Sequence, residues 1–487
     1  MGHGIALTAF ILIAVYLASE CKAKAVFAHY LVVGSTYQSH AQQDIDDAVA
    51  IGLDGFALDI GFPNETYVSN TLKDLFDHAA TKGFKLFVSI DASELCAAAY
   101  AMGVNCGDSL LDYDNLFQRY LEHPAYYRGP DGSPMISSFS SGGLVIDQWQ
   151  ALKNSLNTSI YWIPDFDDTQ GYYEADPGWY AYWGELVNGL FSWEAAWPYR
   201  AGYGGAYPGD VSPDLGVLNG TKQHNKTYMI ALSPLQYKDA YNTNLYRPGE
   251  LNLAVRMRNI LSMSPQPDFV EIVTWNDGPE SHYIGTIWPE QNNDTQGTVY
   301  ATQAKAPHNA WQQIIAPFIA AWKNSSTPAS MTPLLTSPAV PATGSVWYKT
   351  ILQNATCTNN VDGYYGEKPD GFDSGHDALN WAISVPADSK GLRVIATSNG
   401  QAFPPTSLRP GLNYGAFENV QAGRQALYLL DGTGEVVMAA VGGPEVEIGC
   451  PDGIYDMNYQ VVGLEAVGAA ECPCCSSSYA SGELRRV

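Results

Sequence analysis

The pattern that most constrains the fold is an alternation of short apolar segments with amphipathic helices over residues 25–322. Residues 25–33 are apolar enough to form a buried strand, and Ala41, Ile45 and Ala48 then recur at helical spacing. A near-continuous apolar strand indicates a sheet that is covered on both faces. This region is therefore predicted to be an α/β domain built around a parallel sheet.

The alternation repeats along the whole region. The strand candidates are residues 25–33, 55–61, 84–91, 135–139, 161–167, 190–198, 227–237 and 269–277. Eight strands that alternate with helices predict a (β/α)8 TIM-type barrel. The alternative is an open, doubly wound sheet, but such a sheet normally has a glycine-rich phosphate loop after its first strand, and this sequence has none there.

The pattern changes after the last helix of this region. Residues 324–345 are rich in proline, serine and threonine, which is typical of a connecting segment. A period of two follows in residues 347–352, 378–385, 392–397, 426–430, 435–441 and 459–466, which predicts a β-sandwich. We therefore expect a barrel at residues 23–323, a connection at 324–345, a β-sandwich at 346–470 and a polar, cysteine-containing tail at 471–487.

The N-terminus resembles a secretion signal. The apolar run at residues 5–18 is too short to span a bilayer and is flanked by small residues, so residues 1–22 are predicted to be a signal peptide with an unfixed cleavage site. Seven glycosylation sequons agree with export; they begin at Asn64, Asn157, Asn219, Asn225, Asn293, Asn324 and Asn354. The protein is expected to be secreted, and either extracellular or associated with a cell wall.

The eight cysteines indicate disulfide bonds in an exported protein. Cys96 and Cys106 bracket a short loop and are expected to form a local bridge. Cys357 and Cys450 occur in the C-terminal part together with Cys472, Cys474 and Cys475, and the sequence leaves their connectivity open. No second ligand group lies at zinc spacing from this cluster, so no metal and no cofactor are predicted.

The charge balance restricts the binding partners. The chain has 50 acidic and 25 basic residues, for a formal charge of −25. Such a surface repels nucleic acids and anionic membranes, so neither is an expected partner. A neutral substrate is not repelled. The protein is expected to be a monomer.

The carboxyl ends of barrel strands meet at one rim, which carries the active site in this fold. The candidate strands end in acidic and aromatic residues, a combination that is typical of a sugar-binding cleft. The residues expected to bind substrate are His29, Tyr30, Asp59, Asp91, Asp165, Asp167, Trp193, Trp275, Asn276, His282 and Tyr283. Trp193 and Trp275 are expected to be exposed platforms for sugar rings.

Asp277 and Glu280 follow the last candidate strand and are spaced for a catalytic pair. Cleavage of a glycosidic bond requires one carboxyl group that donates a proton and a second one that activates water or attacks the sugar. The alternative is that both residues only stabilise a turn or cap a helix. The chain has no His-Glu-x-x-His metal motif and no Gly-x-Ser-x-Gly esterase motif.

Several segments resemble glycoside hydrolase family 71, the fungal endo-α-1,3-glucanases or mutanases. They are residues 25–30, 55–61, 83–91 and, most specifically, 274–285, which includes Trp275-Asn276-Asp277-Gly278-Pro279-Glu280. The resemblance implies a barrel with an adjacent sandwich and an inverting endo-hydrolase of α-1,3-glucan whose acid and base are Asp277 and Glu280. We favour Glu280 as the acid and Asp277 as the base. Inversion requires the two carboxyl groups to lie about 6.5–9.5 Å apart.

Two alternatives to this function stay open. A glycosidase of another linkage could use the same barrel, because a fold does not fix its substrate. A glucan-binding wall protein without activity would also fit the cleft, although the intact Asp277 and Glu280 argue against it. Asp59 departs from the asparagine that we expect in many members of this family.

Overall fold

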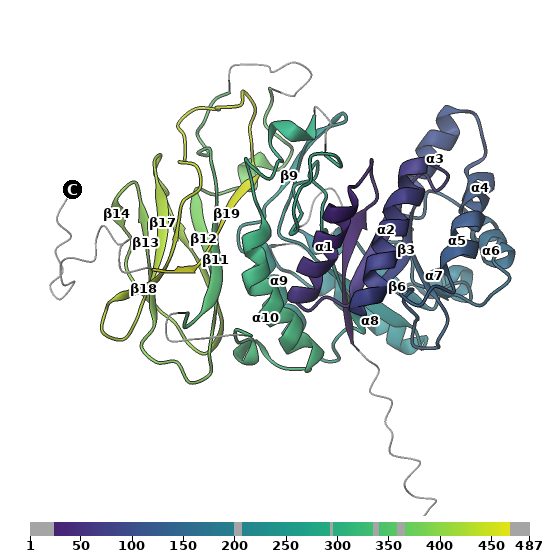
Figure 1. The fold of residues 1–487 in the computed structure, drawn as a ribbon, viewed down its shortest axis with the longest axis horizontal. Helices are drawn as coiled ribbons and strands as arrows, with labels where there is room; N and C mark the ends of the chain where they lie inside the picture. The colour runs from purple at the N-terminus through teal and green to yellow at the C-terminus, as the bar shows by residue number, and fades with distance from the viewer. Residues whose placement is uncertain (1–23, 199–206, 293–295, 335–339, 358–365, 468–487) are drawn as a thin grey trace, which may run out of the picture.

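The computed structural model describes residues 24–198, 207–292, 296–334, 340–357 and 366–467. Several predictions fall outside these residues: the signal peptide at residues 1–22, the sequon at Asn293, and the tail at residues 471–487 with Cys472, Cys474 and Cys475. Two bodies lie side by side, a ring of helices and strands and a flatter β-domain (Figure 1).

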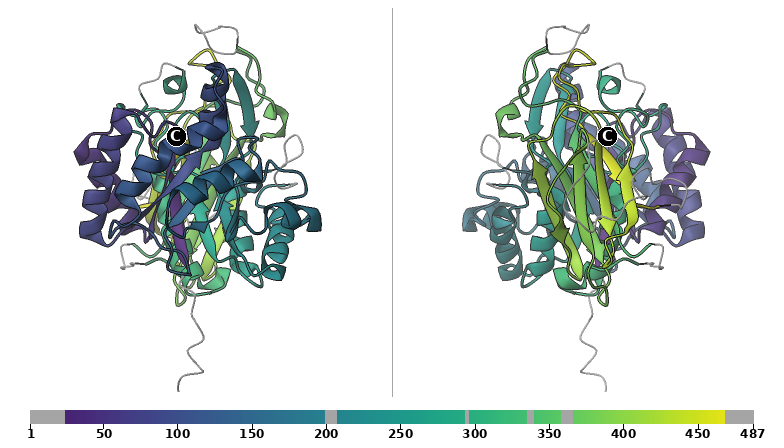
Figure 2. Two further views of the ribbon diagram at one scale, coloured as in Figure 1. Left: turned by 90° about the vertical axis from the view of Figure 1, so that its right-hand side faces the viewer. Right: turned by 90° about the vertical axis from the view of Figure 1, so that its left-hand side faces the viewer.

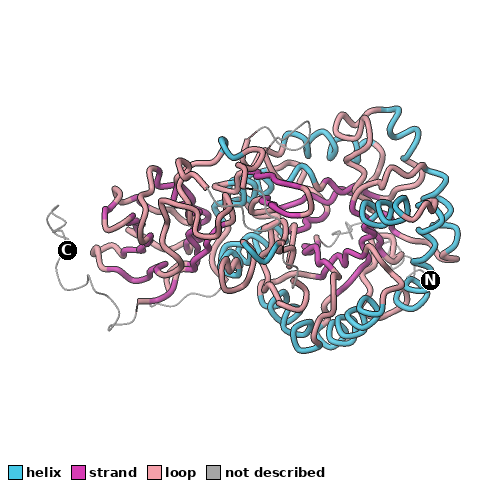
Figure 3. The backbone as a smooth tube through the Cα atoms, turned by 90° about the horizontal axis from the view of Figure 1, so that it is seen from above, coloured by secondary structure: helices cyan, strands magenta, loops and turns pink. Residues whose placement is uncertain are grey.

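The first body is a barrel of eight parallel strands. They are β1 (Ala25–Leu31), β2 (Gly55–Ile60), β3 (Lys85–Asp91), β4 (Met135–Phe139), β5 (Tyr161–Trp162), β6 (Gly189–Ser192), β7 (Thr227–Leu232) and β10 (Phe269–Ile272). Their order is β5-β4-β3-β2-β1-β10-β7-β6, and a parallel bridge between Asp165 and Phe191 joins the two ends. From above, the strands form a ring inside the helices (Figure 3).

The barrel helices shield the outer face of the strands. They are α1 (Gln38–Ala50), α2 (Thr66–Lys82), α3 (Ala92–Ala101), α4 (Cys106–Ser109), α5 (Asp114–Tyr120), α6 (Ile146–Ser155), α7 (Pro177–Trp183), α8 (Ser212–Gln223), α9 (Asn252–Ser262) and α10 (Gln312–Lys323). Helix α2 illustrates the pattern: Val68, Leu72 and Leu75 are buried on one face, and the helix ends at Gly83 with a φ of 70°. In the described segments, no helix combines the length and apolar character needed to cross a bilayer.

Several predicted strands are shorter than expected, among them 161–167, 190–198 and 269–277, and a fourth differs in a way that matters for the site. The candidate at residues 227–237 ends at Leu232, and the chain then forms a hairpin of β8 (Gln236–Ala240) and β9 (Thr243–Arg247). Its two-residue turn, Tyr241 and Asn242, has φ angles of 54° and 61°, as a type I′ turn requires. This inserted hairpin stands beside the rim of the barrel (Figure 1).

The second body is a β-sandwich of two antiparallel sheets. The inner sheet contains β11 (Thr343–Lys349), β12 (Ala378–Val385), β16 (Gly411–Glu418) and β19 (Tyr459–Gly463). The outer sheet contains β13 (Arg393–Ser398), β14 (Gln401–Ala402), β15 (Thr406–Ser407), β17 (Gln425–Leu430), β18 (Val436–Val441) and β20 (Glu465–Ala466). The prediction of a barrel followed by a sandwich is therefore confirmed. Strand β16 was missed because five of its eight residues are only half-buried, which weakens the period-two signal.

The structure also shows where the sandwich begins and how four of the cysteines pair. Strand β11 begins at Thr343, inside the stretch expected to be a connection. The predicted Cys96–Cys106 disulfide is present, and a second disulfide joins Cys357 to Cys450.

The barrel and the inner sheet of the sandwich share one apolar core. Trp347 of β11 is 1% exposed, packs near Trp311, with ring centroids 6.1 Å apart, and donates its indole hydrogen to Glu250 O at 2.7 Å. On the same interface, His308 ring nitrogens lie 3.1 Å from Tyr283 O and 3.0 Å from Tyr459 O. Figure 2 shows the sandwich covering one side of the barrel. The sandwich is thus part of the support of the loop that contains Tyr283.

Replacing Trp347 by alanine should lower the free energy of unfolding by about 3–5 kcal/mol, because it opens a cavity in this shared core. Since the core is shared, calorimetry of the wild type should give one cooperative transition, and the variant should shift it as a whole. Two resolved transitions, of which only one responds to Trp347→Ala, would mean that the bodies unfold independently.

Candidate active site

The segment that follows β10 folds back on itself at the rim. Thr274 N donates to His282 O at 2.9 Å, and Ile284 N donates to Thr274 O at 3.1 Å. Within this loop, Asp277 N donates to Thr274 Oγ1 and Glu280 N donates to Asp277 Oδ1, both at 3.0 Å. These bonds fix the backbone and place Asp277, Glu280 and His282 together.

The two predicted catalytic carboxylates are close neighbours. One oxygen each of Asp277 and Glu280 and one nitrogen of His282 all lie within 4.8 Å of one another. The side chain of Asp277 is 10% exposed and that of Glu280 is 22% exposed, while His282 is fully buried below them. At least one oxygen of each group thus approaches the other more closely than the about 6.5–9.5 Å that separates the two carboxyl groups of an inverting pair.

The β8–β9 hairpin supplies the partners of Glu280. Lys238 Nζ lies 2.9 Å from Glu280 Oε1, and Gln236 Nε2 donates to Glu280 Oε2 at 2.7 Å. Both oxygens of Glu280 are therefore engaged by donors, one of them an ammonium group. Charge-assisted hydrogen bonds of this kind favour the ionised carboxylate.

The surroundings shift the pKa values of the two carboxyl groups in opposite directions. Burial alone would raise the pKa of Glu280, but Lys238 and His282 outweigh it and hold the pKa well below its ordinary value. Burial raises the pKa of Asp277, and the nearby Glu280 carboxylate adds to this rise. The positive charges of His282 and Lys238 oppose the rise but do not cancel it. A pair with separated pKa values is the arrangement that general acid–base catalysis needs.

Hydrogen bonds hold His282 next to the acids. Its Nδ1 lies 3.2 Å from Thr274 Oγ1, which accepts from Asp277 N. Its Nε2 lies 3.1 Å from Glu280 Oε2 and 3.7 Å from Asp277 Oδ2. The fully buried His282 ring thus faces both acids through Nε2.

A second charged group lies on the adjacent strands. His29 Nδ1 is 2.7 Å from Glu271 Oε1, and His29 Nε2 is 3.4 Å from Asp59 Oδ1. Asp91 is partly exposed and its carboxylate caps α3 by accepting from Glu94 N at 2.8 Å. Burial, followed by the nearby Asp59 carboxylate, raises the pKa of Asp91 well above its ordinary value.

Asp165 and Asp167 lie in a deeper layer. Asp165 is 1% exposed and Asp167 is 3% exposed. Asp167 accepts from Tyr173 Oη at 2.7 Å and Glu194 N at 2.8 Å, and burial raises its pKa to about 7. Glu194 in turn pairs with Arg247, whose guanidinium group lies 5.3 Å from the Trp197 ring.

This deeper layer reaches the catalytic loop. Trp197 stacks on His282 with ring centroids 5.4 Å apart. Asp165 and Asp167 were expected to bind substrate, but their burial makes them supports of the wall that holds His282.

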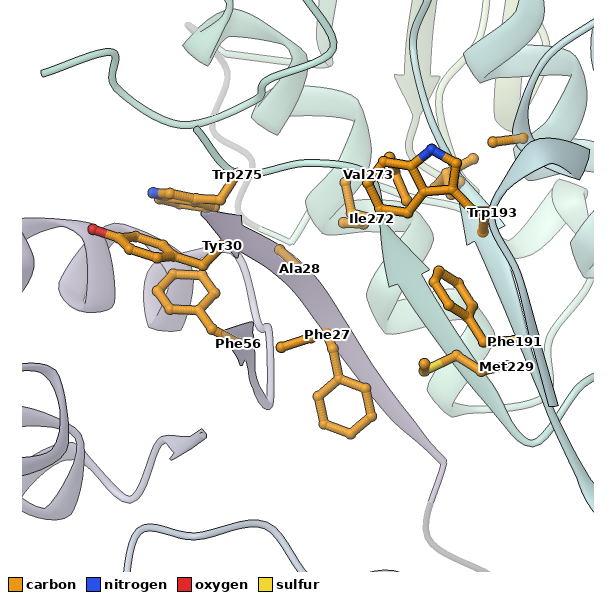
Figure 4. Close-up of a cluster of buried hydrophobic side chains, with 14 of the residues drawn as sticks. Phe27, Ala28, Tyr30, Phe56, Phe191, Trp193, Met229, Ile272, Val273 and Trp275 are labelled. Atoms are coloured by element: carbon orange, nitrogen blue, oxygen red, sulfur yellow. The ribbon is translucent and has the colours of Figure 1, made fainter. Parts of the chain in front are cut away.

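The expectations for Tyr30 and Trp275 are wrong, because both side chains are completely buried. Successive side chains of a strand point to opposite faces, so His29 faces the barrel interior and Tyr30 faces α1, where its hydroxyl donates to Asp44 at 3.0 Å. Trp275 follows the end of β10 and packs on Phe56, with ring centroids 5.2 Å apart (Figure 4). Neither can offer a face to a sugar ring.

Three more residues serve the structure of the site and do not line an open cleft. Asn276 uses its side-chain amide on Leu31, accepting from N at 2.8 Å and donating to O at 3.0 Å. Tyr283 is fully buried, and its hydroxyl donates to Ala306 O. Trp193 is 5% exposed and lies edge-on to His29 at 4.8 Å, so it forms a floor where we expected an exposed platform.

Sequence reasoning missed three donors to the acids, Gln236, Lys238 and Arg247, and the counter-ion of His29, Glu271. The first three lie on the β8–β9 hairpin, of which the candidate strand at residues 227–237 included only the first two residues. The sequence signal for the hairpin was weak, because its strands contain Lys238, Asp239 and Asn244, residue types that are depleted in strands, and Tyr-Asn is not a usual hairpin turn. Glu271 lies inside an apolar strand, where a lone acid could have suggested a buried counter-ion.

Asp277, Glu280 and His282 have the spacing of metal ligands. However, Lys238 and Gln236 already donate to both oxygens of Glu280. A cation next to an ammonium group at 2.9 Å from the same carboxylate would be repelled. The geometry therefore favours acid–base chemistry by the side chains themselves.

Comparisons with known proteins agree with one another. The model of glycosyl hydrolase family 71 matches residues 22–472. Glucan endo-1,3-alpha-glucosidase agn1 of Schizosaccharomyces pombe is 28% identical over 443 residues, which are 85% of this chain and 91% of the relative. A mutanase of Penicillium rubens is 30% identical over 354 residues, which are 71% of this chain and 70% of the relative.

A third relative and one solved structure are also similar to this chain. The ascus wall endo-1,3-alpha-glucanase of Schizosaccharomyces pombe is 29% identical over 275 residues, 54% of this chain and 58% of the relative. The GH99 endo-alpha-mannosidase of Bacteroides thetaiotaomicron is 12% identical, with a TM-score of 0.45 over 62% of this chain and 98% of the other.

Replacing Lys238 by methionine should raise the pKa of Glu280, because the ammonium group that lowers it is removed. The carboxyl carbon signal of Glu280, followed by NMR while the pH is varied, measures this change. The control is Lys305→Met, which removes a lysine that pairs with Asp452 on the surface. An unchanged Glu280 titration in Lys238→Met would contradict the assigned electrostatics.

Proposed function

Because the chain belongs to glycosyl hydrolase family 71 and is a glycoside hydrolase, we propose that it cleaves internal α-1,3-glucosidic bonds of α-1,3-glucan. The names of three relatives, two glucan endo-1,3-alpha-glucosidases or glucanases and one mutanase, support this substrate. The single observation that carries the mechanism is the pair of rim carboxyl groups whose pKa values are moved apart.

In this proposal Asp277 is the general acid. Its raised pKa favours the protonated carboxyl group, which can deliver a proton to the glycosidic oxygen as the bond breaks. Glu280 is the general base, since Lys238 holds it ionised and ready to take a proton from water. These roles are the reverse of the assignment that we favoured from the sequence.

The stereochemical proposal is inversion. Water activated by Glu280 attacks the anomeric carbon from the face opposite to the leaving oxygen, which needs about 6.5–9.5 Å between the two carboxyl groups. Since one oxygen of each acid lies within 4.8 Å of the other, we expect the facing oxygens to turn apart when a glucan chain and the water enter between them. Glu280 is on a loop and its lysine partner is on a hairpin, so both belong to elements that can shift without breaking the barrel.

We also propose that the protein is exported to the extracellular space or the cell wall. The support is the apolar N-terminal segment, the two disulfides and the exposed position of six sequon asparagines in the described segments: Asn64, Asn157, Asn219, Asn225, Asn324 and Asn354.

Glu280→Gln and Asp277→Asn should each lower kcat by about 10²–10⁴-fold, because each removes one proton-transfer group and keeps its shape. Release of reducing sugar from insoluble α-1,3-glucan measures the loss, and sedimentation with the same glucan should show that binding is retained. The matched control is Glu447→Gln, an exposed glutamate of the sandwich. Undiminished sugar release by Glu280→Gln would remove that residue from the mechanism.

Freshly released sugar should be the β-anomer if the reaction inverts the α-linkage. Proton NMR during the first minutes of hydrolysis reports the anomer before it equilibrates. Initial α-anomer would instead indicate a retaining reaction, for which carboxyl groups about 5–5.5 Å apart are usual.

A further inference from the structure

A buried histidine joins three neighbouring barrel strands below the rim. His29 of β1 lies between Glu271 of β10 and Asp59 of β2. Its Nδ1 is 2.7 Å from Glu271 Oε1, and its Nε2 is 3.4 Å from Asp59 Oδ1. The side chains of His29 and Glu271 are each 1% exposed, whereas that of Asp59 is 13% exposed.

The geometry defines the charge of this histidine. A neutral imidazole has one N–H, so its second nitrogen would direct a lone pair at a carboxylate. With a carboxylate at each ring nitrogen, only the imidazolium form has a hydrogen toward both. Burial opposes a charged ring, but Asp59 and then Glu271 outweigh it and raise the pKa of His29 to about 10.

Asp59 lies near other carboxyl groups, and the His29 imidazolium is the positive charge that faces it. The charge of Asp59 contributes to the raised pKa values of both Asp91 and Glu94, which places three carboxyl groups on one side of the rim. In the part of the chain that the structure describes, no lysine or arginine forms an ion pair with Asp59. Replacing the imidazolium by a neutral group would leave Asp59 among like charges, which favours its protonation.

We propose that His29 is a positioning residue, which as an imidazolium ion holds Asp59 ionised and oriented so that Asp59 accepts a hydrogen bond from a glucose hydroxyl beside the Asp277–Glu280 pair. This role rests on the proposed function. His29 also contacts the edge of Trp193, whose ring lies 5.9 Å from that of His282, so the same group is packed against the support of the catalytic loop. The charged groups that face His29 are Glu271, Asp59 and, farther away, Asp91.

The charge of His29 can be measured without any substrate. In the ¹⁵N-histidine spectrum of the full-length protein, both ring nitrogens of His29 should carry hydrogens at every pH up to about 9, since a group with a pKa of about 10 stays protonated there. The signals are assigned by their loss in His29→Gln. A neutral tautomer of His29 at pH 8 would overturn the proposal, whether or not the protein cleaves α-1,3-glucan.

The pH profile tests the role of that charge. His29→Gln removes the positive charge 3.4 Å from Asp59, so the acidic limb of kcat/KM on a soluble α-1,3-glucan oligomer should move up by about one pH unit, a tenfold loss on that limb. Most of the loss should appear in KM, and His29→Lys, which restores a positive charge, should move the limb back. The matched control is His78→Gln, because His78 pairs with Asp46 on the outside of the barrel, 2.8 Å away.

A structural role alone predicts a different result. If His29 only filled space, His29→Gln would lower kcat/KM by the same factor at every pH, and His29→Lys would be worse. That outcome overturns the proposal. Should His29→Gln fail to fold, Glu271→Gln gives the second test. This variant keeps the shape of the side chain next to His29 Nδ1 but removes its charge, so the ¹⁵N spectrum should show the pKa of His29 lowered.

Discussion

The structure of the barrel rim depends on a few positively charged side chains that lie between closely spaced carboxyl groups. Lys238 contacts Glu280 from the inserted hairpin, and His29 lies between Asp59 and Glu271 in the barrel wall. Carboxylates this close cannot all ionise unless a positive charge or a proton is placed among them. The position of each cation therefore affects which carboxyl group is ionised, and in the proposed mechanism this separates the roles of Asp277 and Glu280.

The fold supplies these positions from elements far apart in the sequence. The hairpin inserted after β7 carries Lys238, while the loop after β10 carries both acids and is braced by Trp197 from the end of β6. The sandwich adds to this support through His308, which contacts carbonyl groups of both the loop and β19. The C-terminal domain thus belongs to the framework of the active site and is not a detached module.

The sequence predicted the architecture because each barrel strand is an apolar run and each helix has one apolar stripe. It also located Asp277 and Glu280, since their segment follows the last strand. It failed at residues whose role depends on contacts across the fold. Tyr30 and His29 are adjacent, yet only the strand geometry separates an outer-face tyrosine from an inner-face histidine. Trp275 was misplaced because β10 ends at Ile272, after which alternation no longer determines direction. Lys238 was missed because the candidate strand at residues 227–237 ended just before it and the hairpin was not recognised.

The proposed mechanism depends on the placement of one proton, which should lie on Asp277 and not on Glu280. Neutron diffraction from deuterium-exchanged crystals at the pH of maximal activity locates that proton directly. We expect density for deuterium on the Asp277 carboxyl group, none on Glu280, and three deuterons on Lys238 Nζ, one of them directed at Glu280. Deuterium on Glu280 with a bare Asp277 would contradict the mechanism, and the acid and base would then have to be exchanged.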